Sequence, residues 1–196
     1  ERLGLEAVYA FHLNHGLRGA EAGRDEQAVR SFCRTLGVPL YCEHARMLAR
    51  EKPAGLSVEM WARELRCRWY YRYARRLGCR VATAHNQNDC AETVLFQLAR
   101  GSGLDGAAGI PPVRGRIIRP LIWTGREEIE AYCAAHGLDF QADSTNADTR
   151  YARNRIRWEV IPALRRVHPG MEENFRRSVR LLSEEETYLN GQAEEK

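Results

Sequence analysis

The strongest constraint on the fold is an alternation of short apolar segments with longer helical segments that end at glycine. Apolar residues at helical spacing are followed by Gly37, Gly78 and Gly101, a common helix C-terminal signal. The apolar segments are rich in β-branched and aromatic residues, as buried strands are. This order predicts an α/β fold with a mostly parallel sheet flanked by helices. We expect strands within 5–13, 38–44 and 79–85, and helices over 25–36, 57–77 and 89–100.

A further short strand is expected within 116–121, followed by a helix from Thr124, with Glu127 placed for a capping box. From Tyr151 onward the pattern is helical throughout, with breaks expected at Pro162 and Pro169. We expect this segment to lead away from the sheet towards another domain. The predicted organisation is an α/β nucleotide-binding domain over 1–148 and a helical extension over 149–196.

Composition favours a protein of the cytoplasm. The six cysteines include no CxxC pair, so neither a zinc ribbon nor a dithiol redox site is indicated. No apolar run approaches the roughly 20 residues that span a bilayer, and the first residues do not resemble a signal peptide. We therefore expect a soluble chain with no membrane partner.

Nearly all basic residues are arginine, and thirteen of the arginines form two dense segments, 63–80 and 150–166. Arginine matches phosphate geometry with two hydrogen bonds, so these segments suit a polyanion such as nucleic acid. A solvated helix face is an equally good interpretation of the charge alone.

The stretch "AHNQNDCAET", residues 84–93, lies where the third strand turns into a helix. Asp89 and Glu92 have the spacing of a capping box, which would give them a purely structural role. The polar residues before them, His85, Asn86 and Asn88, exceed what one cap needs. Ligands collect at this edge of a parallel sheet, and carboxylates there suit an ammonium group or magnesium shared with phosphates.

A second polar stretch, "HLNHGLRG", ends the first strand and places His12, Asn14, His15 and Arg18 at the same edge. No third ligand at metal spacing accompanies the two histidines, so zinc is not indicated. The stretch "GSGLDG" at 101–106 fits the dinucleotide pattern G-x-G-x-x-G, but it follows a helix instead of a strand. It is interpreted as a turn at a helix end, with a mobile substrate-facing loop as the alternative.

The segment 143–157, "DSTNADTRYARNRIR", combines turn-forming residues with arginines. An Asx-type turn explains Asp143, Ser144 and Asn146. Arg153 and Arg157 stand four apart, so they share a helix face and could grip phosphates.

Seven ordered motifs together resemble the catalytic domain of the tRNA(Ile)-lysidine synthetases: "NHGLRG", "ARELRCRWYYRYA", "ATAHNQNDCAET", "RGSGLDG", "IRPLI", "DSTNADTRYARNRIR" and "VIPALRR". That family belongs to the PP-loop ATP pyrophosphatases, which have an adenine nucleotide alpha-hydrolase-like fold. The resemblance implies that ATP, with Mg²⁺, adenylates the wobble cytidine of isoleucine tRNA with a CAU anticodon. The ε-amine of L-lysine then displaces AMP and leaves lysidine. Relatives are often homodimers, so the resemblance also implies a homodimer as an expectation.

The resemblance assigns roles residue by residue. Asp89 and Glu92 match the acids that hold the lysine ammonium, with Asp89, Arg153 and His85 as catalytic residues. The residues matched to ATP binding are Arg63, Arg66, His85, Arg153 and Arg157. Asn86 and Asn88 replace the family's usual histidine and aspartate, and the resemblance leaves the metal ligands unknown. The proton of the lysine ammonium, whose reference pKa is about 10.4, could go to His85 or to solvent.

The family's S-G-G-x-D-S loop, which binds pyrophosphate, is absent from the 196 residues. Residues 1–4 resemble those that follow the loop and its helix, and the sequence stops where the family continues into C-terminal domains. We therefore expect a fragment that is impaired or inactive alone, and lysine transfer by this chain would contradict that. Two alternatives stay open: another PP-loop tRNA-modifying enzyme of the thiolase type, and a noncatalytic tRNA-binding module.

Overall fold

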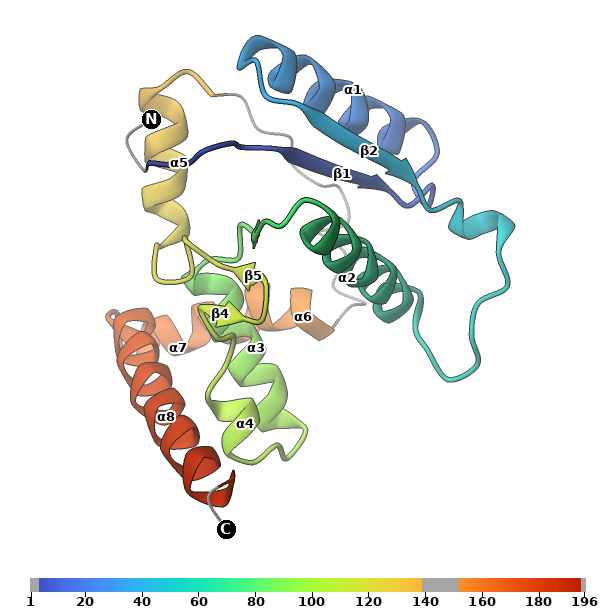
Figure 1. Ribbon diagram of the computed structural model, residues 1–196. Coiled ribbons are helices and arrows are strands. Elements are labelled where there is room, and N and C mark those ends of the chain that lie inside the picture. The colour runs from blue at the N-terminus through green and yellow to red at the C-terminus, as the bar shows by residue number, and fades with distance from the viewer. Residues whose placement is uncertain (1–3, 139–151, 195–196) are drawn as a thin grey trace. The chain divides into compact units, whose positions relative to one another are not determined.

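The computed structural model describes residues 4–138 and 152–194, which form two compact units (Figure 1). The first unit ends at Cys79 and the second begins at Arg80. The predicted boundary between 148 and 149 falls outside the described residues and stays a prediction. The structure is a mixed α/β fold with parallel strand pairs, flanking helices and a helical C-terminal region, as predicted.

The first unit is a β-α-β arrangement with a second helix. β1 (Ala10–Asn14) pairs in parallel with β2 (Leu40–His44), in the register Ala10↔Leu40 to Asn14↔His44. Because α1 (Ala20–Thr35) joins these parallel strands, it forms the crossover connection. The short helix η1 (Met47–Ala49) and α2 (Val58–Arg76) follow. Figure 1 shows α1 and α2 on opposite sides of the strand pair.

The side of the strand pair that faces α2 is aromatic. Phe11 and Tyr41 stack with ring centroids 5.6 Å apart, and both contact Tyr73 of α2, at 5.4 and 5.1 Å. Trp69 of α2 packs edge-on against Phe11 at 5.8 Å and is 3% exposed. Each such pair contributes about 0.5–1.5 kcal/mol beyond burial of its area. The large side chains at helical spacing on α2 therefore hold this helix against the strands.

The second unit contains a small sheet and most of the helices. β3 (Val81–Ala82) pairs in parallel with β5 (Ile117–Ile118), which lies within the predicted strand 116–121. β4 (Val113–Arg114) pairs antiparallel with β5 through a tight turn that the sequence did not predict. The helices of this unit are α3 (Gln87–Ala99), α4 (Leu104–Ala107), α5 (Arg126–Ala135), α6 (Ala152–Arg155), η3 (Ile156–Val160), α7 (Ile161–Val167) and α8 (Met171–Glu194).

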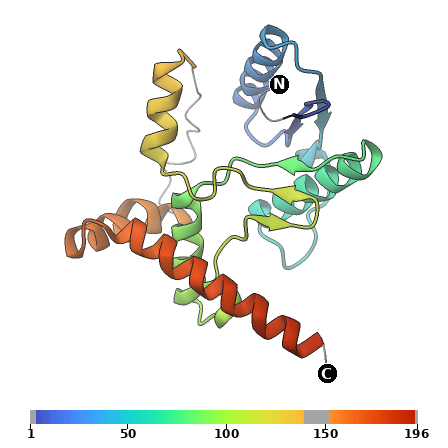
Figure 2. The same cartoon turned by 60° about the vertical axis from the view of Figure 1, so that its left-hand side comes forward.

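The C-terminal helices pack against α3, and the expectation that they lead towards another domain stays a prediction. Ala91 of α3 shares a buried cluster with Ile156, Ile161 and Met171. Val179 of α8 joins a second cluster, which includes α3 side chains. Figure 2 shows α8 passing across α3 and α4. The C-terminal helices complete the core of the second unit because they bury apolar side chains of α3.

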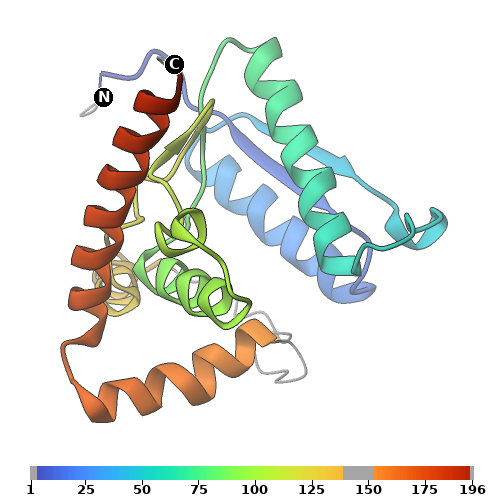
Figure 3. The same ribbon diagram turned by 90° about the horizontal axis from the view of Figure 1, so that it is seen from below.

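The helix break expected at Pro162 is wrong, whereas the break at Pro169 is confirmed. α6, η3 and α7 run on without interruption, and η3 is a π-helical stretch just before Pro162. A π turn accommodates a proline, which lacks the N–H that an α-helix needs. His168 leaves the helical conformation, and α7 and α8 then meet at a sharp corner (Figure 3).

The helix starts show where the sequence patterns were off by a few residues. The helix expected from residue 25 begins at Ala20. The capping box expected at Thr124 and Glu127 lies one residue further along the chain, where Glu128 accepts from the N–H of Gly125 at 2.8 Å. The stretch 101–106 forms the predicted turn at the end of α3 and the start of α4. Gly109, which follows α4, packs on the core beside Cys90, Val94 and Val179.

Gly109→Ala is expected to destabilise the protein by about 2–3 kcal/mol. Its φ is +70°, and an added Cβ would lie 2.8 Å from the Cys90 sulfur and 3.1 Å from Val94 Cγ2. Gly101→Ala is the matched control, because its φ is +77° but nothing lies within 4 Å of the added Cβ. The control is expected to cost about 1 kcal/mol. Urea denaturation measures both, and equal losses would contradict the close packing at Gly109.

Candidate functional site

The central feature of the second unit is a buried carboxylate held by two arginines. Glu92 of α3 is 0% exposed. Its Oε2 accepts from Arg153 Nε at 3.0 Å, and its two oxygens accept from Arg157 Nε and Nη2 at 2.6 and 3.1 Å. Arg153 also donates from Nη2 to Thr93 Oγ1 at 3.0 Å and to the Asp89 carbonyl at 3.2 Å. We call these five residues, Asp89, Glu92, Thr93, Arg153 and Arg157, the acid–arginine cluster.

Helical spacing explains how the acid–arginine cluster forms. Asp89, Glu92 and Thr93 stand three and four residues apart, so they share one face of α3. Arg153 and Arg157, four apart on α6 and η3, present both guanidinium groups to that face. The sequence prediction that these two arginines share a face is confirmed. Their target was not predicted, because nothing in the sequence pairs a residue of α3 with one about 60 positions later.

The charges of the acid–arginine cluster compensate one another. A buried carboxylate is costly unless it is paired and hydrogen-bonded, and Glu92 has both. Burial by itself disfavours the Arg157 cation, but hydrogen bonds and negative charge from Glu92, with the charge of Asp89, raise the pKa of Arg157 above its usual value. Arg157 therefore stays charged, and its hydrogen bonds to Glu92 hold it in a fixed position.

The cap of α3 differs from the one expected. Asn86, not Asp89, is the N-cap: its Oδ1 accepts from the Asp89 N–H at 3.1 Å. Asp89 Oδ2 accepts in return from the Asn86 N–H at 3.0 Å. The capping box thus lies three residues before the predicted one, which leaves Glu92 to the arginines. Asp89 Oδ1 lies 3.8 Å from Arg157 Nη2, and the side chain is 24% exposed.

The other polar residues around the start of α3 have partners within the protein. Asn88 Oδ1 accepts from the Arg126 N–H at 3.0 Å, which joins the starts of α3 and α5. His85 Nδ1 lies 2.9 Å from Thr83 Oγ1. Asn86 and Asn88 therefore have structural roles that explain much of the polar crowding in the sequence.

In the first unit, the polar residues at the end of β1 are organised around Glu26 of α1. Asn14 Nδ2 donates to Glu26 Oε2 at 3.0 Å, and Asn14 Oδ1 accepts from the Gly16 N–H at 2.9 Å. Arg18 is paired with Asp25. The predicted strand-end residues thus shape the turn after β1.

Two histidines and an arginine lie near the same strand end. Burial lowers the pKa of His12 and of His15, and the charge of Arg66 lowers the pKa of His15 further. Both imidazoles therefore favour the neutral form. Arg66 is half-buried, while Arg63 is exposed on α2. This unit brings His12, His15 and Arg66 together.

Among the described residues, one group has metal-ligand geometry: Glu26, Cys42 and His44, with ligand atoms within 4.8 Å. The Glu26 carboxylate is already bonded to Asn14, Arg30 and His44. Burial and the Glu26 carboxylate raise the pKa of the Cys42 thiol to about 11. A protonated thiol and an adjacent guanidinium disfavour a cation, so we interpret this group as a hydrogen-bonded cluster.

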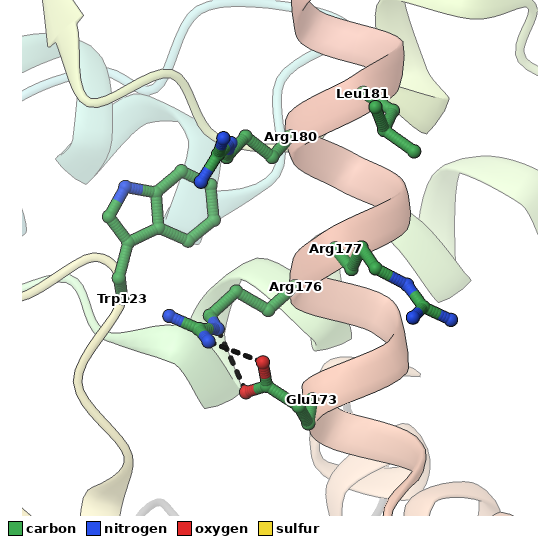
Figure 4. A pocket seen from close by; sticks show the side chains of 6 residues that line it. All are labelled: Trp123, Glu173, Arg176, Arg177, Arg180 and Leu181. Carbon is green, nitrogen blue, oxygen red and sulfur yellow. Dashed lines mark hydrogen bonds and ion pairs between the residues drawn. The ribbon is translucent and has the colours of Figure 1, made fainter.

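Two adjoining hollows of about 350 and 400 Å³ lie along α8 and share Trp123 and Arg180. Figure 4 shows Arg176 and Arg180 extending from α8 towards Trp123, while Glu173 binds Arg176. No residue predicted for the site lines either hollow. Trp123 was not predicted as a site residue, nor was Arg119, which is 7% exposed and donates to the Pro111 carbonyl.

A sequence model of the PP-loop domain family matches residues 1–164. The chain belongs to this family. This PP-loop domain is 40% identical over 190 residues to the tRNA(Ile)-lysidine synthase of Caldanaerobacter subterraneus, covering 96% of the chain and 41% of the relative. It is 44% identical over 189 residues to that of Symbiobacterium thermophilum, covering 93% of the chain and 39% of the relative. The chain thus spans about two fifths of the length of these relatives.

A solved structure supports the fold of this PP-loop domain. The U34-tRNA thiolase NcsA from Methanococcus maripaludis, described with its [4Fe-4S] cluster, aligns with a TM-score of 0.72 at 18% identity. The alignment covers 90% of this chain and 62% of the thiolase chain. Within the described residues, no helix of the PP-loop domain combines the length and apolar character needed to cross a membrane.

Glu92→Gln is expected to destabilise the PP-loop domain by roughly 2–3 kcal/mol, because it leaves Arg153 and Arg157 without their counter-charge. The expected loss is below that of a fully buried pair, since these arginines are 34% and 21% exposed. Glu130→Gln is the control, as its pair with Arg126 is on the surface. Chemical denaturation compares the two, and similar losses would contradict a stabilising role for Glu92.

Glu26 is expected to make stability depend on acid pH. The hydrogen bond from Asn14, with those from Arg30 and Cys42, lowers the pKa of Glu26 from 4.5 to about 2. A carboxylate with a lowered folded-state pKa stabilises fully above its unfolded pKa and loses this effect as pH falls towards 2. The stability gap between the unmodified protein and Glu26→Gln should therefore narrow below about pH 4.5.

Urea midpoints from about pH 6 to pH 3 test this dependence. Glu59→Gln, an exposed change in the same unit, should show a small gap that does not vary with pH. A constant gap for Glu26→Gln would contradict the role of Asn14 and Arg30 in holding the Glu26 anion.

Proposed function

We propose that this chain carries the catalytic domain of a tRNA(Ile)-lysidine synthetase. In this reaction, ATP adenylates the wobble cytidine of isoleucine tRNA with a CAU anticodon and releases pyrophosphate. The ε-amine of L-lysine then displaces AMP to form a carbon–nitrogen bond. Supporting this, relatives about 40% identical over nearly the whole chain are named tRNA(Ile)-lysidine synthase.

The observation that carries the proposal is the acid–arginine cluster. It joins two motifs far apart in sequence, "DCAET" and "RNRIR", through direct bonds between Glu92 and both arginines. A polyanionic transition state requires fixed positive groups, which work best when they are positioned before the reaction. We assign Arg153 and Arg157 to the nucleotide, with Arg63, Arg66 and His85 as further ATP contacts.

Asp89 is the acid best placed for the lysine ammonium. Its side chain is partly exposed, and Oδ1 has only a long contact, 3.8 Å, to Arg157. Glu92 is buried and both of its oxygens accept from arginines, so we propose that it acts on lysine mainly by setting the charge and position of its neighbours. The attacking amine must lose a proton, and we propose His85 as acceptor, since an ordinary imidazole titrates near pH 6.5.

We propose that Mg²⁺ is held mainly by the phosphates of ATP and by water. Mg²⁺ usually takes one or two carboxylates together with phosphates and water, but the Asp89 oxygen outside the capping box is assigned to the lysine ammonium. Bound to the phosphates, the ion would offset their negative charge. Glu92 is not available as a ligand, because its oxygens are used by the arginines.

A thiolase-type enzyme is the second candidate, favoured by the likeness to the U34-tRNA thiolase. That neighbour holds a [4Fe-4S] cluster, and such clusters are bound by several cysteine thiolates. Here all six cysteines are free, and within 4–138 and 152–194 the one group with metal-ligand geometry contains a single cysteine. This distribution favours an amine nucleophile. The free thiols also suit the cytoplasm, our proposed location, while the homodimer stays a prediction.

Asp89→Asn is expected to raise the KM for lysine roughly tenfold or more, because a charged hydrogen bond to the ammonium is lost. ATP binding should change much less. The measurement is transfer of labelled lysine to a CAU-anticodon isoleucine tRNA transcript, using the protein encoded by the complete reading frame that contains this chain. Asp105→Asn, which removes an exposed acid from α4, is the control.

The outcomes separate the alternatives. Equal losses in lysine use and ATP binding would reduce Asp89 to a helix cap. An intact protein that transfers no lysine would reject lysidine synthesis, and ATP-dependent sulfur insertion would then identify a thiolase. Absence of any ATP-dependent reaction, with tRNA binding retained, would identify a noncatalytic module.

A further inference from the structure

The second half of α2 carries a dense positive charge that the proposed reaction does not use. Between Arg63 and Arg80 the sequence has seven arginines and one acid, Glu64. Arg63 and Arg66 are assigned to ATP. Four others are exposed on α2, and we call them the α2 arginine face: Arg68, Arg72, Arg75 and Arg76.

The geometry of α2 makes this face continuous and rigid. At 3.6 residues per turn the four arginines fall within about 100° around the helix, and at 1.5 Å per residue they extend over about 12 Å. The inward-facing part of the helix carries Trp69, Tyr73 and Ala74, which are held in the aromatic packing or fully buried. The helix therefore presents the arginines to solvent in a fixed order.

Local stability does not explain the charge. Like charges at four-residue spacing, such as Arg68 with Arg72 and Arg72 with Arg76, destabilise a helix. The dipole of the helix favours Arg75 and Arg76 in the last turn, but its effect does not reach Arg68 and Arg72.

Neutralisation of the face is slight. Arg68 contacts Glu64 at 3.2 Å and Arg72 contacts Glu43 at 3.7 Å, with the arginines 75% and 68% exposed. Such surface pairs are weak and readily exchanged. Within the described parts of the chain, Arg75 and Arg76 form no ion pair through their side chains. The face therefore has charge available for a partner.

We propose that the α2 arginine face binds the phosphate backbone of a helical stem of the tRNA; this rests on the proposed function. A duplex carries about one charge per 1.7 Å, so 12 Å of stem presents about seven phosphate charges. Arginine binds phosphate with two parallel hydrogen bonds. The exposed groups of this face are mainly guanidinium groups, with Tyr71 partly exposed beside them, and guanidinium groups are typical contacts of the phosphate backbone.

The composition of the face argues against a membrane as the partner. A helix that lies on a membrane pairs its basic side with an exposed apolar side that enters the bilayer. Here the apolar side of α2 is packed against the strands of the same unit. The binding is expected to be electrostatic and independent of tRNA sequence.

The test compares two double variants in the protein from the complete reading frame. Arg68→Gln/Arg72→Gln removes two charges from the face, and glutamine keeps the helix propensity. Arg24→Gln/Arg34→Gln removes two exposed arginines of α1 in the same unit as a charge-matched control. Binding of a fluorescent isoleucine tRNA transcript is measured by anisotropy at several salt concentrations, with circular dichroism to verify folding.

The face variant is expected to bind tRNA at least tenfold more weakly at 0.1 M salt, since each lost contact costs about eightfold by counterion release. Its salt slope should fall by about two, roughly one for each removed contact. In lysine transfer, the KM for tRNA should rise with kcat little changed. The control should match the unmodified protein.

Unchanged binding by the face variant, or equal weakening by the control, would overturn the proposal. So would face-dependent binding to phosphatidylserine vesicles without an effect on tRNA. The proposed function fails separately: lysine transfer would then be absent, whatever the tRNA affinity of the variants. Intact transfer with unchanged tRNA binding would reject the α2 arginine face alone.

Discussion

The buried carboxylate of Glu92 is the interaction on which the second unit depends. Burial of Glu92 removes one negative charge from water. Hydrogen bonds and ion pairs with Arg153 and Arg157, from helices about 60 residues later, offset this desolvation free energy. Because an unpaired charge would be expensive there, α3 and the segment of α6 and η3 are stable only together. Packing of Ala91 against Ile156 and Ile161 beside it adds an apolar contribution. Charge pairing specifies the arrangement, and apolar burial stabilises it.

In the first unit, the strand pair packs against two helices, α1 on one side and α2 on the other. Side chains alternate along a strand, so Phe11 faces the aromatic packing of α2 while Asn14 binds Glu26 of α1. The α2 side supplies most of the apolar contact. The α1 side supplies hydrogen bonds that shape the turn after β1. A one-residue shift in register would exchange the two sides, which explains why the strand is well specified in the sequence.

Much of this arrangement followed from sequence, and the errors have a common physical origin. Helix and strand types, the glycine stops and the shared face of Arg153 and Arg157 depend on local periodicity. Each capping box depended on which of two nearby residues is the N-cap of the helix. Asp89 can be an N-cap with Glu92 or the third helical residue after Asn86, and the arginines decide by binding Glu92. At α5, the Thr124 carbonyl accepts from Gln87, which moves the cap to Gly125. In both helices, tertiary contacts determine which residue is the N-cap.

The charges of the acid–arginine cluster also limit how it can recognise ligands. Its two acids and two arginines cancel formally, so neither a triphosphate nor an ammonium is attracted by net charge. The cluster instead holds its positive and negative groups at different places. Glu92 fixes the two arginines from the buried side, while Asp89 keeps a partly exposed oxygen 3.8 Å from Arg157. An anion near the arginines and a cation near Asp89 would then favour each other. Such a site suits a reaction that joins an amine to a phosphate-activated substrate.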